Sequence, residues 1–420
     1  MNKFISYVTA MMLFLVTGAG VQSQWQEQVS GLTTSLNSVS GVNDNIAWVC
    51  GNAGKVLRTN NGGINWINAT GTGIPGTLDL YNIFAIDSTT ALVTGSNTTA
   101  YVYRSTNGGL TWVQVFTQTG GFLNAIWMTT PMTGVMYGDP VGSRWSLWRT
   151  TNGGVNWDST GMFVAQAGSE AGWNNALFVS GSNIWFGTNN SRVYYSPLTG
   201  LTGTWQVQST TQASSYAIWF NTTTSGMLGG TQLMATNNGG VNWTAVTSPG
   251  SGNVTGITGS ATNWWFTRQA TSIYRTTDNG VTFTTDYTAP AGTFTHIQKA
   301  ATGSRMWAVR NNGGITSSLS TVGIEPVSTE IPGAFSLSQN YPNPFNPATK
   351  FNFSLPEGAN VSIRIFDIAG REVDVIVNNQ FMSQGVYTVN YSADRLSSGV
   401  YFYRITANEL IKKKKMVLTK

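Results

Sequence analysis

A turn built on Asn-Gly-Gly, or a variant of it, recurs seven times between Lys55 and Thr316. Each copy follows a short apolar run, and most are followed by an aromatic residue two positions after the next apolar one. The equivalent glycines of the seven copies are Gly63, Gly109, Gly154, Gly203, Gly240, Gly280 and Gly314. A period of about 40 residues with several short strands in each unit is typical of β-propellers. The sequence therefore predicts an all-β chain with a seven-bladed β-propeller over residues 24–316.

Each repeat divides into four short strands of alternating apolar and polar residues, as in LYNIFAID, TALVTGSN, AYVYRST and LTWVQVF of the second copy. The acceptor side chains of the turns are Asn61, Asn107, Asn152, Asn238, Asp278 and Asn312. We expect each acceptor to bond a backbone N–H two residues on, while the glycine that usually follows permits a positive φ. These residues are predicted to shape a hairpin and to have no chemical role.

The two ends of the repeat array complement each other. The seventh turn is followed by SSLSTVG, which lacks the outer strand that carries Trp in other copies, whereas QWQEQVSG near the N-terminus resembles such a strand without a turn before it. We expect Trp25–Ser30 to form the outer strand of the last blade and so to close the ring.

The N-terminal residues 1–23 read as a secretory signal peptide. An apolar run extends from Phe4 to Val16, and small residues precede the expected cleavage before Gln24. A membrane anchor is the alternative, but the run is shorter than the roughly 20 residues that cross a bilayer. We therefore expect a mature chain without a transmembrane segment. With Cys50 as its single cysteine, that chain has no internal disulfide.

Composition argues against several classes of function. Charged residues make up 9% of the chain, against roughly 25% in ordinary globular proteins, and aromatic residues make up 12%. The net charge of +5 is spread over both halves, so no basic field for nucleic acid is expected. His296 is the only histidine, and we interpret it as structural or surface-exposed. No metal site and no cofactor is predicted.

The pattern changes after the repeats. Residues 317–333 are rich in Ser, Pro, Gly and Glu, which indicates a linker. Residues 334–420 again show short alternating strands, now separated by Pro, Gly and Asp turns. This pattern predicts a small Ig-like β-sandwich.

The third and fourth repeats carry a feature that the others lack, in the stretches MYGDPVGSRW and AGSEAGWNNALF. The candidate ligand-binding residues in them are Asp139, Arg144, Trp145, Glu170, Trp173, Asn174 and Asn175. We expect the charged residues to share one rim of the central channel, opposite the Asn-Gly-Gly turns. Either they form an ion-pair network that braces the loops, or they recognise a peptide or glycan with Trp145 or Trp173 as a platform.

The turn resembles the Asp-box (BNR) turn of sialidase-like propellers, and the repeats are similar to photosystem II stability/assembly factor-like proteins. The stretches around Asp139 and Glu170 also resemble a GDP…GEAG pattern in that second family. The first resemblance implies a glycoside hydrolase as an alternative, with Asp139 and Glu170 as the two carboxylates that the chemistry needs. A sialidase also needs three converging arginines. Five arginines instead recur before the turns: Arg58, Arg104, Arg149, Arg275 and Arg310.

The last 85 residues resemble the type A C-terminal sorting domain of the bacterial type IX secretion system. The residues that carry the resemblance are Asn340, Tyr341, Pro342, Asn343, Pro344, Phe345, Gly399, Tyr401, Lys412, Lys413, Lys414 and Lys415. The resemblance implies recognition by an outer-membrane translocon and a sorting peptidase, and release or surface attachment of the cargo. It also implies a Bacteroidetes-type bacterium. A solvated charge run is the other interpretation of the four lysines.

The sequence thus favours a secreted or cell-surface, non-enzymatic propeller that binds a protein or glycan. A glycoside hydrolase of the sialidase or xyloglucanase-like propeller type and a structural surface-layer component are the alternatives.

Overall fold

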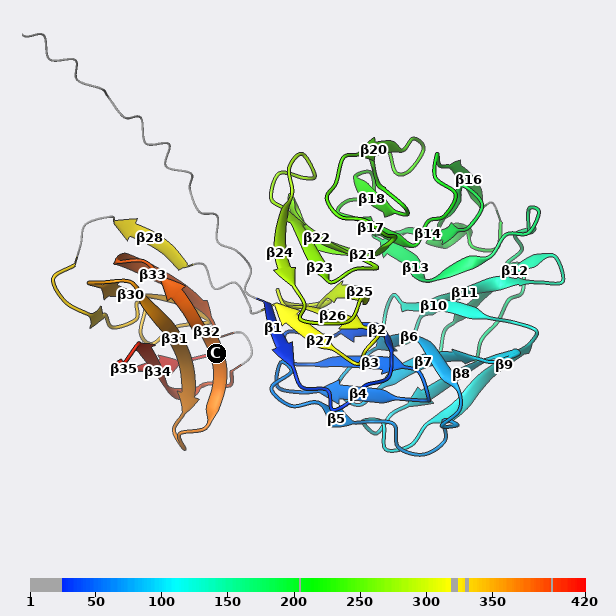
Figure 1. Ribbon diagram of the computed structural model, residues 1–420. Helices are drawn as coiled ribbons and strands as arrows, with labels where there is room; N and C mark the ends of the chain where they lie inside the picture. The colour runs from blue at the N-terminus through cyan, green and yellow to red at the C-terminus, as the bar shows by residue number, and fades with distance from the viewer. Residues whose placement is uncertain (1–24, 204, 319–323, 329–331, 394–395) are drawn as a thin grey trace, which may run out of the picture.

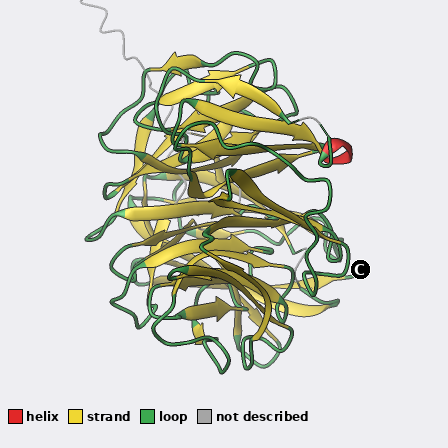
Figure 2. Ribbon diagram, turned by 90° about the vertical axis from the view of Figure 1, so that its right-hand side faces the viewer, coloured by secondary structure: helices red, strands yellow, loops and turns green. Residues whose placement is uncertain are grey.

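The computed structural model describes residues 25–203, 205–318, 324–328, 332–393 and 396–420. The predicted signal peptide lies outside these residues. The described chain is built of β-strands and one short 3-10 helix, η1 (Leu198–Gly200) (Figure 2). No helix of the described residues has the length and apolar character needed to span a membrane.

Seven antiparallel sheets lie side by side in the first part of the chain (Figure 1). We number them along the chain by their inner strands. Sheet 1 comprises β2 (Leu36–Gly41), β3 (Ala47–Gly51), β4 (Val56–Thr59) and β5 (Ile67–Asn68). Sheet 2 comprises β6 (Asp79–Ala85), β7 (Ala91–Ser96), β8 (Thr99–Ser105) and β9 (Val113–Thr119). Sheet 3 comprises β10 (Leu123–Met128), β11 (Gly134–Val141) and β12 (Arg144–Thr150). Sheets 4 and 5 comprise β13 (Gly172–Ser180), β14 (Asn183–Thr188), β15 (Arg192–Pro197) and β16 (Gln206–Ser209); and β17 (Ala217–Phe220), β18 (Gly226–Gly229), β19 (Leu233–Thr236) and β20 (Thr244–Val246). Sheets 6 and 7 comprise β21 (Val254–Ser260), β22 (Asn263–Arg268), β23 (Ser272–Thr276) and β24 (Thr284–Thr288); and β25 (Phe294–Lys299), β26 (Met306–Arg310), β27 (Ile315–Ser318) and β1 (Trp25–Gln28).

The sheets form a closed ring. Each inner strand contacts the inner strand of the next sheet, and β25 contacts β2. The N-terminal strand completes sheet 7, because β1 pairs antiparallel with β27 from Trp25 opposite Ser318 to Gln28 opposite Ile315. This pairing confirms the predicted closure. Buried aromatic and aliphatic side chains fill the space between neighbouring sheets, as propeller packing requires.

The closing strand is fixed by side chains as well as by its ladder. Glu27 forms an ion pair with the buried Arg310 and accepts hydrogen bonds from Tyr287 and Thr316. The indole N–H of Trp25 donates to Asp286 Oδ2 at 2.7 Å. Sheet 7 therefore holds its fourth strand by charge-assisted hydrogen bonds in addition to backbone pairing.

The Asn-Gly-Gly turns are held differently from the expectation. In five turns the Asn or Asp side chain accepts the N–H four residues on, as Asn61 does from Asn65 at 3.0 Å, and only Asn312 accepts from the residue two positions on. The cause is two consecutive residues of positive φ, such as Gly62 and Gly63 with φ of 72° and 85°, or Asn279 and Gly280 with φ of 58° and 90°, which bring the chain back towards the acceptor. A Ser or Thr hydroxyl two residues before the acceptor also takes the N–H of the second glycine. These hydroxyl residues are Thr59, Ser105, Thr150, Thr236 and Thr276.

Sheet 3 has three strands instead of the predicted four. After β12 the chain makes only isolated bridges to it, from Asp158 to Arg149 and from Ala165 to Arg144. A local turn interrupts this edge, because Asp158 Oδ1 accepts the N–H of Thr160 at 2.9 Å and Gly161 has a φ of 75°.

The C-terminal part forms two four-stranded sheets around one apolar core. Their strands are β28 (Ile324–Ser328), β33 (Gly385–Ser392), β30 (Ala348–Leu355) and β29 (Ser336–Leu337) in one sheet, and β32 (Glu372–Met382), β31 (Ala359–Asp367), β34 (Gly399–Ala407) and β35 (Leu410–Leu418) in the other. Residues 324–328 were predicted to be linker but pair with β33. Pro326 contributed to the prediction of a linker. An edge strand nevertheless tolerates proline, because the missing N–H would have pointed away from the sheet.

Candidate functional site

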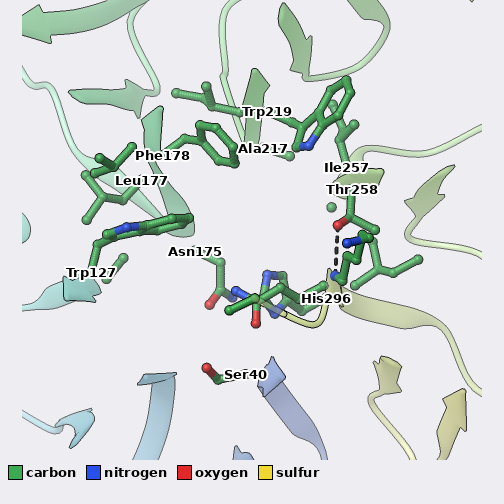
Figure 3. Close-up of a pocket in the computed structure, with 18 of the residues that line it drawn as sticks. Ser40, Trp127, Asn175, Leu177, Phe178, Ala217, Trp219, Ile257, Thr258 and His296 are labelled. Carbon is green, nitrogen blue, oxygen red and sulfur yellow. Dashed lines mark hydrogen bonds between the residues drawn. The ribbon is translucent and has the colours of Figure 1, made fainter. Parts of the chain in front are cut away.

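A cavity of about 580 Å³ lies inside the ring and is lined by residues of all seven inner strands (Figure 3). The lining runs to the C-terminal ends of these strands and includes the first turn residues beyond them, such as Gly181, Asn221 and Ala301. The cavity therefore opens at the end of the ring where the first and second strands of each sheet are joined.

The Asn-Gly-Gly turns lie on this same face. The first turn glycine donates its N–H to the hairpin between the first two strands, from Gly62 to Asn45 O at 2.9 Å and from Gly108 to Thr89 O at 2.8 Å. Similar bonds recur in sheets 3, 5 and 6. The expectation had placed the site opposite these turns, so the cavity lies at the other end of the ring from the predicted rim.

One side of the cavity is aromatic. Phe84, Trp127, Phe178 and Trp219 come from four consecutive inner strands, and Figure 3 shows the last three along one side. The ring centroids of Trp127 and Phe178 are 5.3 Å apart, and those of Phe84 and Trp127 are 6.1 Å apart. Their sequence signal is an aromatic residue directly after an aliphatic one at the same place in these four inner strands, as in AIWM and AIWF. Sequence analysis missed it because such residues also suit a blade core.

The other side is polar and contains the single histidine together with Ser40 and Asn175, all labelled in Figure 3. His296 follows a bulge in β25, where the register shifts between Phe294 and His296. Its Nδ1 accepts the N–H of Val39 at 3.2 Å, and burial lowers the pKa of the imidazole to about 4. His296 is therefore neutral at pH 7, with its proton on Nε2. The interpretation of His296 as a structural residue explains the hydrogen bond at Nδ1. The N–H at Nε2 remains available to a ligand in the cavity.

Asp139 lies in β11, away from the cavity lining. Its Oδ1 accepts hydrogen bonds from Asn124 Nδ2 at 2.8 Å and from the N–H of Gly172 at 2.7 Å. Burial raises the pKa of this carboxyl, and the two hydrogen bonds oppose that rise. Only glycine fits at 172, because a Cβ there would lie 2.4 Å from Asn124 and 2.9 Å from Tyr137. Asp139 thus ties the start of β13 to sheet 3.

Glu170 is buried in the connection before β13. Its Oε2 accepts hydrogen bonds from Tyr194 at 2.9 Å and from the N–H of Ala167 at 3.1 Å, and Arg192 approaches Oε1 at 3.5 Å. These contacts brace the loop that leads into sheet 4.

Arg144 and Trp145 do not join this carboxylate. Arg144 donates to Met162 O at 3.0 Å and lies over the ring of Phe163. Among the described residues, it forms no salt bridge with Asp139 or Glu170. Trp145 is fully buried between Tyr137, Phe186 and Tyr194, so the expectation that it is a surface platform is wrong.

Trp173, Asn174 and Asn175 lie near the start of β13. Trp173 packs against Tyr216 with ring centroids 4.2 Å apart, and Oδ1 of Asn174 is buried without a hydrogen bond. Asn175, with a φ of 64°, reaches across to sheets 1 and 2: its Oδ1 accepts from Ser38 at 2.7 Å and from Asn82 at 2.9 Å. It is the one predicted site residue that also lines the cavity.

The periodic arginines act between sheets. Arg58 donates to Gly108 O at 2.9 Å and Arg104 donates to Gly153 O at 2.8 Å, each reaching the turn of the next sheet. Arg149 pairs with the exposed Asp158 within its own repeat. The expected periodic, non-converging arrangement holds for these three residues.

The residues that resemble a sorting signal lie together in the C-terminal sandwich. Asn340 donates to Pro342 O and to Thr349, both at 3.0 Å, which shapes the loop. Asn343 accepts the N–H of Val417 at 2.8 Å, and the buried Phe345 donates its N–H to Val417 O at 3.0 Å. The loop is thus bonded to the final strand, β35.

Strand β35 also carries Lys412–Lys415, all exposed, on the edge of its sheet. Gly399 and Tyr401 lie on β34, which pairs with β35, and Tyr401 donates to Ser397 O at 2.8 Å. Exposed lysines on an edge strand oppose pairing with other chains. Because they are exposed, the same lysines are also accessible to a partner that binds this strand.

Comparisons with known proteins agree with this architecture. Residues 339–419 match the family described as "Secretion system C-terminal sorting domain". Among curated proteins, none matches the chain.

Many solved structures match the chain, and two of them illustrate the likeness. "YCF48 from Cyanidioschyzon merolae" is 18% identical with a TM-score of 0.54, and the match covers 70% of this chain and 98% of that one. "YCF48 bound to D1 peptide" is 15% identical with a TM-score of 0.57, over 70% of this chain and 96% of that one. At these identities the likeness shows the fold alone. The chain therefore combines a β-propeller that resembles YCF48 in fold with a type IX secretion-system C-terminal sorting domain, which directs export across the outer membrane to the cell surface or beyond.

Proposed function

We propose that this protein is an exported, non-enzymatic propeller that binds an extracellular protein or glycan in the cavity of its ring. The observation that carries the proposal is the cavity itself: about 580 Å³, open on one face, with an aromatic side and a polar side. Pockets of this size and mixed lining are the usual sites of ligand binding.

The contacts of the two candidate carboxylates favour binding over hydrolysis. A glycosidase places two carboxyl groups on either side of one substrate bond. Here Glu170 is buried and bonded to Tyr194 and Ala167, and Asp139 is bonded to Asn124 and Gly172. Neither lines the cavity. These contacts suit residues that brace loops and position Asn175.

The route of export extends this proposal. We propose that residues 1–23 are removed as a signal peptide, and that a sorting peptidase then acts on the C-terminal domain after the translocon has recognised it. Whether the cargo is released or attached to the surface is decided at that step. The solved neighbour that is bound to D1 peptide makes peptides one of the ligand classes to test.

The test is binding of the purified mature chain to glycan and peptide arrays. Trp127→Ala should weaken binding at least tenfold, because it removes one ring of the closest aromatic pair in the cavity lining. Trp148→Ala is the matched control, since Trp148 is half-buried against Phe116 and does not line the cavity. Equal binding by both variants would contradict the proposal. Glycan turnover abolished by Glu170→Gln would support the hydrolase instead.

A further inference from the structure

Several polar side chains of the inner strands accept hydrogen bonds from backbone N–H groups of the inner strand of the adjacent sheet. Gln298 Oε1 accepts the N–H of Gly41 at 2.9 Å, and Ser40 Oγ accepts the N–H of Ala85 at 3.0 Å. Thr258 Oγ1 accepts the N–H of Lys299 at 2.8 Å, as Figure 3 shows, and His296 Nδ1 accepts as described above. These bonds join sheet 6 to sheet 7, sheet 7 to sheet 1 and sheet 1 to sheet 2.

This arrangement leaves mainly donors for a ligand. Once Oε1 of Gln298 is occupied, its amide NH₂ remains, and once Nδ1 of His296 is occupied, its Nε2–H remains. The hydroxyl of Ser40 keeps its proton in the same way. Among the described residues, none of these donor atoms has a hydrogen-bond partner. The polar side of the cavity is therefore complementary to a ligand rich in acceptors.

The charge of the cavity lining also favours a ligand rich in acceptors, and in particular an anion. Apart from the neutral His296, Lys299 is the only acidic or basic residue among those that line the cavity. Its Nζ donates to Gly303 O at 2.6 Å, and partial burial lowers its pKa. An anion beside Lys299 would stabilise the ammonium form and receive a charge-assisted hydrogen bond.

The aromatic side narrows the class of anion. Phe84, Trp127 and Phe178 form an arc of rings that buries flat apolar surface but offers few polar groups. A pyranose ring combines an apolar face with a rim of oxygens, so it can pack against this arc and accept hydrogen bonds from the opposite side. A small inorganic anion would leave the arc uncovered.

We propose that the cavity binds a uronic acid unit of an acidic glycan, with the sugar ring against Trp127 and Phe178 and the carboxylate towards Lys299 and Gln298. This inference rests on the proposed function and specifies the ligand of the same cavity. It predicts a preference for the acid that a purely aromatic site would not show.

The experiment is titration calorimetry of the mature chain with trigalacturonate and with its methyl ester, which keeps the sugar rings but replaces each carboxylate by an uncharged ester group. The acid should bind about tenfold or more tightly than the ester, because a hydrogen bond to a charged group is worth about that factor. Rising salt should weaken binding of the acid and leave the ester unchanged.

Two variants locate the carboxylate. Gln298→Glu keeps the acceptor for Gly41 and replaces the donor by a negative charge, so it should lose binding of the acid. Lys299→Gln should reduce the acid to the affinity of the ester, and Lys350→Gln, an exposed lysine of the C-terminal domain, is the control. The comparison of acid and ester on the unmodified protein does not depend on either variant folding.

The outcomes separate the two proposals. Equal binding of acid and ester, still sensitive to Trp127→Ala, would overturn the acidic ligand and leave the binding function standing. Binding of a peptide through its free C-terminal carboxylate, with no glycan bound, would also overturn the acidic glycan. Absence of binding by every glycan and peptide tested would overturn both.

Discussion

Acidification should destabilise the propeller through its single histidine. Desolvation of the imidazole lowers the pKa of His296, so the folded chain takes up a proton there only near pH 4, against 6.5 for a free imidazole. Between these values the unfolded chain binds the proton and the folded chain does not. Stability is therefore complete above pH 6.5 and falls as the pH drops towards 4. The difference between 6.5 and about 4 corresponds to about 3 kcal/mol of unfolding free energy.

The assay is denaturant unfolding of the mature chain between pH 7 and 4.5, followed by tryptophan fluorescence. All 16 tryptophans lie between Trp25 and Trp307, so the signal reports the propeller even in the intact chain. His296→Asn is the reference, because Asn retains an acceptor for Val39 but does not titrate. Asp139, whose raised pKa acts in the opposite sense, is present in both proteins and cancels in the difference.

The stability of the natural protein relative to His296→Asn should fall by about 2 kcal/mol as the pH drops from 7 to 4.5, because the full difference is reached only below pH 4. A constant difference between the two proteins would refute the reasoning. It would mean that water or a shifted backbone allows His296 to accept a proton inside the fold.

Three further predictions concern the ring and its export. Deletion of residues 24–30 should lower the melting temperature sharply, because it exposes β27 and leaves Arg310 buried without Glu27; an unchanged melting temperature would argue against closure by β1. Thr59→Val should cost about 1–2 kcal/mol in denaturant unfolding by leaving the N–H of Gly63 without its acceptor, and a cost near zero would show that water replaces the hydroxyl. Replacement of the last 12 residues should leave the chain in the periplasm on cell fractionation; its appearance in the medium would contradict a sorting role for β35.

The repeat predicted the propeller well, because each blade forms its strands and its turn with the same types of residue at the same positions. Alternation marked the strands, and the unmatched ends of the array identified β1 as the missing strand of sheet 7. The prediction of strands was wrong where local hydrogen bonds or backbone conformation depart from the pattern of the repeat. Asp158 and Gly161 break the outer edge of sheet 3, and β28 pairs despite a composition typical of linkers.

The site was harder to predict because its residues are ordinary members of the repeat. Sequence analysis looked for interruptions and found Asp139 and Glu170, whose contacts brace loops. The cavity is instead built from Trp127, Phe178 and His296, one from each of three inner strands. Their importance depends on convergence around an axis, which strand patterns along one sequence do not reveal.

The pairing of Trp25 with Ser318 also determines how the ring responds to mechanical force. The chain enters β1 and leaves β27 at the same end of this strand pair, so tension between the two termini would separate the strands one hydrogen bond at a time. Such peeling needs less force than shearing, in which all the bonds break together. Glu27 lies within the pair, and its ion pair with Arg310 at the end of β26 would hold after Trp25 had separated. Pulling on the sorting domain while the N-terminus is still tethered would thus open the ring at its seam before it disturbed any other sheet.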